Sequence, residues 1–177
     1  MPKGGNVKKA LGALEDMAEG IHKLVRTHYE VHVGILGHKA GRNEIVKTKS
    51  GKRKENRGHP SLNSLTNAEL GLIHEKGSLT AKIPPRSFLV KPLKMKEDEL
   101  KKMSAADLNK LFKTGKVMLF LKRIGKSAEK IIQQAFATGG FGMWWSLEAS
   151  TKARKNSSAI LIDSGQLRRS ISSRVVE

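Results

Sequence analysis

The sequence predicts an α+β fold: a small antiparallel sheet with a basic hairpin arm, packed by one long amphipathic helix and several shorter helices. Three patterns lead to this prediction. Hydrophobic residues recur every three or four positions over 117–136, as on one face of a helix, and they alternate with other residues over 31–35, as in a half-buried strand. Residues 38–60 are basic and nearly free of hydrophobic side chains. The 177 residues are expected to form a single domain over 1–177, with 38–60 as its exposed arm.

The chain carries 34 Lys and Arg against 16 Asp and Glu, a net charge of +18, and contains no cysteine. The charge makes polyanions, acidic protein surfaces and anionic lipid its natural electrostatic partners. The lack of cysteine excludes disulfides, thiolate catalysis and zinc sites that need sulfur. Neither a signal peptide nor a membrane span is predicted, because acidic residues interrupt the N-terminal hydrophobic stretch and the longest uncharged apolar run is Val117–Leu121. We therefore expect a soluble protein of a reducing compartment with no membrane partner.

The first predicted elements are a helix followed by a strand. Hydrophobic residues spaced by three and four over 7–25 indicate an amphipathic helix. Alternation of Val31, Val33 and Ile35 with other residues indicates a strand that ends at Gly37.

The segment 38–60 is the most basic part of the chain, with eight Lys or Arg against two Glu. It is expected to form an exposed hairpin or a mobile arm, in which 44–48 pairs back on the first strand if it extends. Its charge density suits contact with phosphates, but it has no aromatic residue on which bases could stack. Two interpretations stay open: a surface that faces DNA or docks on a partner, and a solvated loop that serves solubility. Its basic residues are Lys39, Arg42, Lys47, Lys49, Lys52, Arg53, Lys54 and Arg57.

Short helices are predicted in the middle of the chain. Thr66 and Glu69 have the spacing of a capping box, which starts a helix that stops at Gly77. Pro85 can occupy the first turn of a helix through Phe88 and Leu93, which Pro92 would kink or shorten. Residues 97–113 indicate one or two short helices, with a second capping-box pattern at 104–107.

The long helix over 117–136 is expected to be the main core element. After it, the glycines at 139–142 indicate a tight turn, and the only two tryptophans, Trp144 and Trp145, follow. The C-terminal residues predict an extended piece, a turn at 163–165, one helical turn near Gln166, and a closing strand with Ile171 and Val175 on one face.

Candidate catalytic and metal-binding motifs have ordinary structural explanations. His28 and His32 have a spacing used by metal ligands on helices, but a strand has begun there, so a metal site is not expected. His74 and Glu75 are expected to be a cation at a helix C-terminus beside an exposed acid, not a catalytic pair. The SxxK pattern of Ser127 to Lys130 has a KTG companion at 113–115, but the order is reversed and no SDN triplet exists. The 139–142 glycines lack the spacing of a phosphate-binding loop. No enzyme activity and no cofactor are predicted.

Three segments together resemble the virion morphogenesis family of tailed bacteriophages, which contains tail-completion and neck proteins. The segment LGLIHEKGSLTAKIPPRSFL, Leu70 to Leu89, resembles that family's helix, its His-Glu-x-Gly turn and its "iPpRpFl" stretch. Trp144, Leu147, Thr151 and Lys155 have the spacing of its W-x-x-L-x-x-x-T-x-x-x-K segment. LIDSGQLRRSISSRV, Leu161 to Val175, is similar to its "LidTGqLrrSI" signature.

The resemblance implies an α+β structural subunit without catalysis that forms a ring with itself, of six or twelve copies. It would be made in the host cytoplasm and sit in the virion neck, against the portal-side connector and the tail tube or terminator proteins, where DNA passes through it. The motif positions are Pro84, Pro85, Arg86, Phe88, Leu89, Trp144, Leu147, Thr151, Lys155, Asp163, Gly165, Leu167, Arg168 and Ile171.

The motif residues would then have physical roles. The stiff proline segment suits Arg86 for a lasting ion pair with an acidic neighbour or subunit, and Phe88 and Leu89 would anchor it in the core. Asp163 would accept backbone N–H bonds of its turn. Leu167 and Ile171 would pack inward, with Arg168 and Arg169 pointing outward.

The function expected from the sequence is therefore a structural virion protein of the phage neck that joins or completes the head–tail connection. The alternative is a free-standing basic nucleic-acid-binding protein without catalysis. In the neck protein the arm at 38–60 would face the DNA channel or an acidic patch on an adjoining connector protein. Any contact with DNA would not read its base sequence.

Overall fold

The computed structural model describes residues 4–40, 46–47, 53–54, 65–154, 159–162 and 165–177. It divides into two compact units, each assembled from separate stretches of chain. The first unit contains 1–33, 96–128 and 173–177, and the second contains 34–95 and 129–172. The single domain over 1–177 stays a prediction.

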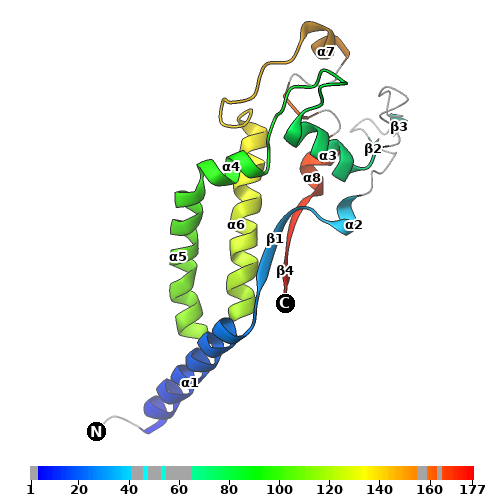
Figure 1. The fold of residues 1–177 in the computed structure, drawn as a ribbon. Helices are drawn as coiled ribbons and strands as arrows, with labels where there is room; N and C mark the ends of the chain where they lie inside the picture. The colour runs from blue at the N-terminus through cyan, green and yellow to red at the C-terminus, as the bar shows by residue number, and fades with distance from the viewer. Residues whose placement is uncertain (1–3, 41–45, 48–52, 55–64, 155–158, 163–164) are drawn as a thin grey trace. The chain divides into compact units, whose positions relative to one another are not determined.

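The first unit contains α1 (Gly4–Arg26), most of β1 (Glu30–Ile35), α5 (Glu97–Thr114), the first half of α6 (Val117–Ala137) and the end of β4 (Ile171–Val176). β1 pairs with β4 in a two-stranded antiparallel sheet (Figure 1). The expected helix over 7–25 and strand over 31–35 are both present. Together with the long α6 they confirm the predicted α+β class with a small sheet.

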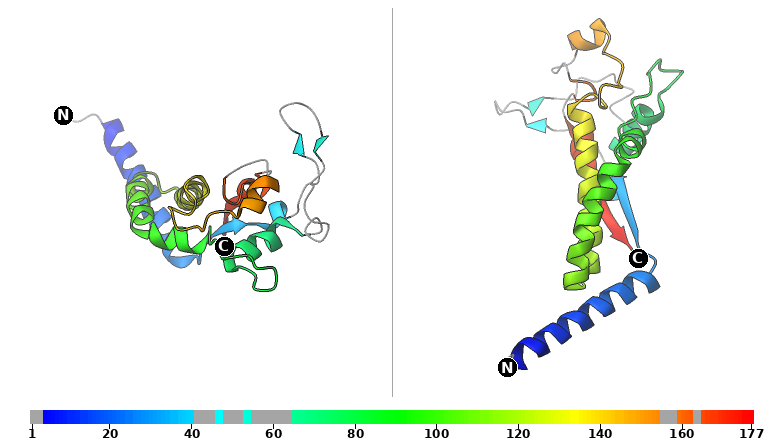
Figure 2. Two further views of the ribbon diagram at one scale, coloured as in Figure 1. Left: turned by 90° about the horizontal axis from the view of Figure 1, so that it is seen from above. Right: turned by 90° about the vertical axis from the view of Figure 1, so that its left-hand side faces the viewer.

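The core of the first unit lies where α5, α6 and the sheet meet. Leu111, Val117 and Leu121 are its buried residues, and α5 runs beside α6 in every view (Figure 2). Partly buried hydrophobic side chains pack around them: Tyr29, Val31, Leu108, Phe120, Ile124 and Val175. One side of this core is therefore the sheet, and the other is the pair of helices.

Residues 97–113 form one helix, not two. Ser104 lies inside α5, where its hydroxyl donates to the Leu100 carbonyl at 2.8 Å instead of capping a new helix start. The predicted capping box at 104–107 is therefore wrong, because a serine can satisfy its hydroxyl on the preceding turn of a continuous helix. α5 ends at Gly115, whose left-handed backbone (φ 63°) turns the chain into α6.

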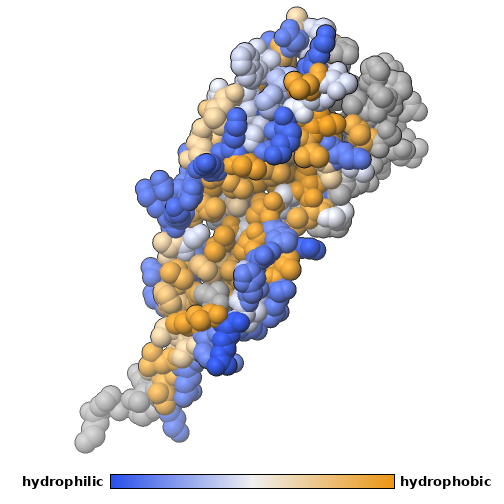
Figure 3. Space-filling model, viewed as in Figure 1, coloured by the Kyte–Doolittle hydropathy of each residue, from blue (hydrophilic) through white to orange (hydrophobic). Residues whose placement is uncertain are grey.

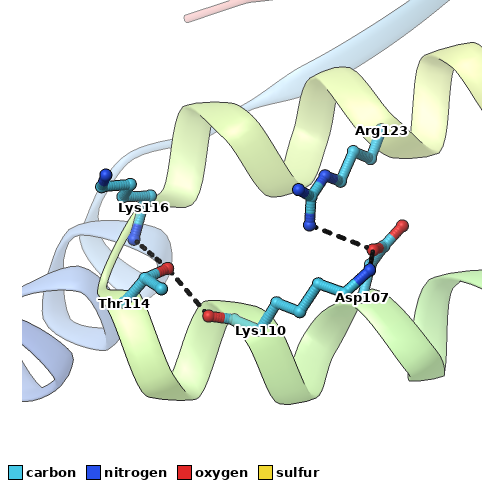
Figure 4. Close-up of polar contacts among 5 residues, drawn as sticks. All are labelled: Asp107, Lys110, Thr114, Lys116 and Arg123. Atoms are coloured by element: carbon cyan, nitrogen blue, oxygen red, sulfur yellow. Dashed lines mark hydrogen bonds and ion pairs between the residues drawn. The ribbon is translucent and has the colours of Figure 1, made fainter.

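Polar contacts tie α5 to α6 beside this turn (Figure 4). The half-buried carboxylate of Asp107 accepts from Lys110 on its own helix at 3.0 Å and from Arg123 on α6 at 3.2 Å. Thr114 donates its hydroxyl to the Lys110 carbonyl at 2.8 Å and accepts from the Lys116 N–H at 3.4 Å. The two helices are thus joined by charge as well as by packing.

α1 crosses the α5–α6 turn at a contact of backbone against backbone. A Cβ on Gly20 would lie 2.5 Å from the Gly115 carbonyl oxygen, and a Cβ on Gly115 would collide with the Asp16 carbonyl. Two glycines therefore permit an approach that any larger residue would block.

The second unit contains α3 (Asn67–Lys76), α4 (Val90–Met95), α7 (Ala149–Arg154), α8 (Gln166–Ser170) and the second half of α6. It also holds α2 (Gly37–Ala40) and the strands β2 (Val46–Lys47) and β3 (Arg53–Lys54). β2 pairs with β3 in an antiparallel hairpin. The expected pairing of 44–48 with the first strand is therefore wrong for Val46 and Lys47, since β1 has β4 as its partner.

α4 begins later than expected. Pro84 and Pro85 lie in extended chain outside any helix, and α4 starts at Val90. Pro92 falls in the first turn of α4. The N–H groups of a first turn have no acceptor inside the helix, so the N–H that proline lacks costs no helical hydrogen bond there. The placement of Pro85 at a helix start is therefore wrong, and Pro92 takes that role.

The second half of α6 supplies the centre of the second unit, which confirms the long helix as a main core element. Ile131, Ile132, Ala135 and Phe136 are all at most 2% exposed. The other buried hydrophobic residues of this unit are Phe88, Trp144, Leu147, Leu167 and Ile171. No helix of the described residues is long and apolar enough to cross a membrane.

The predicted capping box at the start of α3 is confirmed. The Glu69 N–H donates to the Thr66 hydroxyl at 3.2 Å, and the Glu69 carboxylate accepts from the Thr66 N–H at 2.8 Å. The bond from the Thr66 backbone, followed by that from its hydroxyl, lowers the pKa of the Glu69 carboxyl.

We predict that Thr66→Ala lowers the free energy of unfolding by about 1 kcal/mol, because a free N–H at the start of α3 loses its acceptor. Urea unfolding at neutral pH measures the effect. Thr80→Ala, at an exposed turn threonine, is the control and should change stability by less than about 0.5 kcal/mol. Equal stability of the two variants would contradict the capping role.

Candidate functional site

Glu75, at the end of α3, binds four donors of the segment Ser87–Val90. Its carboxylate accepts from the Ser87 hydroxyl at 2.5 Å, from the N–H groups of Phe88 and Leu89 at 2.8 and 3.0 Å, and from the Val90 N–H at 3.1 Å. These donors precede or begin α4, where a helix leaves its N–H groups without internal partners. The expected exposed acid is therefore wrong: Glu75 is half-buried and caps another helix.

Arg86 is held inside the second unit and is 8% exposed. Its N–H donates to the His74 carbonyl at 2.7 Å, and its guanidinium Nε and Nη2 donate to the Trp145 carbonyl, both at 3.4 Å. Burial lowers the pKa of the guanidinium. A carbonyl thus stands where an acidic neighbour was expected, and an ion pair with another subunit stays a prediction.

Trp144 connects the segment that begins with it to the segment that follows Pro84 and Pro85. Its indole Nε1 donates to the Ser87 carbonyl at 3.0 Å. Phe136 lies between the other two rings, with its centroid 5.2 Å from Phe88 and 5.9 Å from Trp144, the latter edge-on. Such aromatic contacts add to the stabilisation from burial alone. Leu147 is buried in the same unit, at 9% exposed.

The C-terminal segment packs on the same core through α3. A Cβ on Gly71 would lie 3.4 Å from Phe88, 3.5 Å from Leu167 and 2.5 Å from Ile35. The missing side chain of Gly71 therefore lets α3 approach all three of these side chains. Leu167 and Ile171 are buried, at 6% and 4% exposed. The inward placement expected of these two residues is observed.

Arg168 does not point outward as expected. It is half-buried, its Nε donates to the Gln133 side-chain oxygen at 2.6 Å, and its carbonyl accepts from Gln133 Nε2 at 3.0 Å. α8 is a single turn that packs against α6. Its two successive arginines therefore cannot both face solvent. Arg169 is exposed, and Gly165 has the left-handed backbone (φ 75°) of the predicted turn.

The other motif positions differ in burial, and two of them lie outside the described residues. Pro84 and Leu89 are half-buried, Pro85 is exposed, and Thr151 is half-buried on α7. Lys155 and Asp163 lie outside the described residues.

The arm is described in part. Lys39 lies on α2 and donates its Nζ to the Arg169 carbonyl at 3.4 Å, so it is attached to the second unit. Lys47 lies on β2, and Arg53 and Lys54 lie on β3. Arg42, Lys49, Lys52 and Arg57 lie outside the described residues.

His28 and His32 both face Glu30. The carboxylate lies 2.6 Å from His32 Nε2 and 3.6 Å from His28 Nε2, and the hydrogen bond to His32 is the first cause of the lowered pKa of the Glu30 carboxyl. Within the described ranges no group of three or more His, Cys, Asp or Glu side chains is placed to hold a metal ion.

Sequence reasoning missed Glu75, Gly71 and Gln133. Glu75 and the donors it binds are separated by a loop, so no periodicity connects them. The available signal was Pro92, whose place in a first turn implies a helix start near Val90 that needs an acceptor.

Protein-family models, curated proteins and solved structures were compared with the chain, and none of them matches it.

We predict that Glu75→Ala lowers the free energy of unfolding by about 3 kcal/mol, because it leaves several part-buried N–H groups without an acceptor. Urea unfolding measures the loss, and hydrogen exchange should show weakened protection of the Phe88, Leu89 and Val90 amides. Glu148→Ala, which removes an exposed acid from the same unit, is the matched control. Unchanged protection of those amides in Glu75→Ala would show that the carboxylate does not hold the segment.

Proposed function

We propose that the chain is a structural subunit of the neck of a tailed-bacteriophage virion. In this proposal it forms a homo-oligomeric ring, of six or twelve copies, that completes the head–tail connection and lets DNA pass. One observation carries the proposal: the three segments that resemble the virion morphogenesis family, far apart in the sequence, pack into one core of the second unit. Trp144 bonds to Ser87, and Gly71 lies against both Phe88 and Leu167.

This arrangement supports a scaffold role for the motif residues. If a motif segment determines the fold of a family, its hydrophobic residues should lie in the core. Its polar groups should form hydrogen bonds to the backbone of other segments. Phe88, Trp144 and Leu167 are buried, while Glu75 and Arg86 bond to backbone groups of neighbouring segments. These polar groups position chain segments against one another, which is the work of a structural subunit.

The basic arm supports a location on the path of DNA. Residues 38–60 carry a net charge of +6, eight basic less two acidic, and their described strands form a hairpin. We propose that this hairpin lines the DNA channel or docks on an acidic patch of an adjoining connector, tail tube or terminator protein. Phosphate contact of this kind is independent of base sequence.

The oligomeric state separates this proposal from a free-standing basic nucleic-acid-binding protein. We predict that mass photometry of the purified chain shows a discrete species of six or twelve copies. The reason is that a ring closes at a fixed number of subunits. A chain that stays monomeric over the accessible concentrations, yet binds duplex DNA with a strong salt dependence, would contradict the ring and favour the free-standing protein.

The arm is tested by removing its charge. We predict that replacing Lys47, Lys49, Lys52, Arg53, Lys54 and Arg57 by Gln reduces retention on heparin and duplex DNA and lowers the slope of log affinity against log salt by as much as about 5. The control replaces six exposed lysines elsewhere by Gln: Lys76, Lys91, Lys94, Lys102, Lys130 and Lys152. Equal loss of retention in both variants would show that net charge matters and the arm does not.

A further inference from the structure

α1 carries a stripe of hydrophobic side chains that the described residues leave exposed. Leu11 and Leu14 are each 56% exposed, Val25 is 79% exposed, and Ala18 is exposed between them. Their spacing of three, four and seven places them on one side of the helix. Hydrophobic surface, drawn in orange, runs along α1 in the space-filling view (Figure 3). Among the α1 residues whose burial is described, only Gly20 is buried. Because helices gain most of their stability from packing an apolar face, this stripe is suited to a partner.

The same helix holds a local excess of negative charge in a strongly basic chain. Residues 10–22 contain Glu15, Asp16 and Glu19 and no Lys or Arg. All three acids are exposed, and none of them forms an ion pair with a residue of the described chain. Glu15, four residues from Leu11, borders the hydrophobic stripe, and Glu19 follows one turn later. Asp16 lies on the opposite side of the helix, where its carbonyl meets Gly115. A partner for the stripe and its Glu15 border should therefore combine hydrophobic and basic side chains.

The outer face of the α5–α6 turn has that combination. Phe112, Met118 and Leu119 are 39%, 41% and 44% exposed. The residues 113–126 around them contain five Lys or Arg and no acid. Lys122 lies one turn along α6 from Leu119, on the side of the helix opposite its core residues.

We propose that the Leu11–Val25 face of α1 docks on the Phe112–Lys126 face of a second copy of this chain. The two faces complement each other in charge and in hydrophobic character, whereas two copies of either face alone would repel. The contact is therefore heterologous, with a different surface on each copy, and such contacts build closed rings when the rotation closes. The inference rests on the proposed function, because it assigns the contact that would form the ring. The Gly20–Gly115 crossing holds α1 against the α5–α6 turn of its own chain.

Charge reversal with rescue tests this contact in the full-length chain. One variant carries Glu15→Lys and Glu19→Lys, and the other carries Lys122→Glu and Lys126→Glu. Each alone should weaken self-association, measured by sedimentation velocity at low ionic strength, by about tenfold. Combining the four substitutions in one chain should restore association, because the same pairs then meet with opposite signs. Lys9→Glu with Lys23→Glu, on the far side of α1, is the control and should have little effect.

A second variant tests the hydrophobic stripe independently of charge. Leu11→Asn with Leu14→Asn should reduce self-association, while Leu72→Asn, at an exposed leucine of the second unit, should not. The docking inference is overturned if the wild-type chain assembles and the α1 variants assemble equally well, or if the fourfold swap gives no rescue. In that case the ring itself survives. A wild-type chain that stays monomeric, including one that uses α1 to bind a different protein, overturns the ring and the docking together.

Discussion

The second unit depends on one carboxylate. Glu75 collects the Ser87 hydroxyl and three successive backbone N–H groups, and so fixes the end of α3 to the beginning of α4. Removing this acceptor would leave donors in part-buried surroundings, where each unmade bond costs about 1–3 kcal/mol. Between these helices the chain makes a turn closed by the pairing of Ser78 with Ile83, and Pro84 and Pro85 follow it outside any helix. Arg86 and Phe88 are directed into the unit as a consequence.

The other motif segments pack on this fixed path. Trp144 bonds to the Ser87 carbonyl, on the same residue whose hydroxyl meets Glu75. Phe136 continues the contact from Phe88 to Trp144, and Gly71 lies against both Phe88 and Leu167. The motif residues look like a functional signature in the sequence. In the structure they hold the segments of the second unit together. The surfaces that we propose for interaction lie elsewhere. They are the basic hairpin and, in the first unit, the hydrophobic stripe of α1 and the basic face of α6.

Local patterns predicted most of the helices, the first strand and the closing strand, because hydrophobic periodicity and capping are encoded by residues close in sequence. The Thr66–Glu69 cap and the long α6 are examples. The predictions that failed depended on partners distant in sequence. Glu75 was expected to be exposed because its donors lie beyond a loop, and Arg168 was expected in solvent because Gln133 lies on another helix. Pro92, not Pro85, lies in the first turn of α4, because a proline signals a helix start without indicating which of two prolines marks it.

Glu75 and Trp144 both bind Ser87, so we expect the three motif segments to form one cooperative core. A double-mutant cycle with Glu75→Gln and Trp144→Phe, followed by urea unfolding, tests it most directly. We expect a coupling energy of about 1 kcal/mol between the two substitutions, because once one contact is lost the segment no longer benefits fully from the other. Additive effects, within about 0.3 kcal/mol, would contradict it and would separate the motif segments into independent parts.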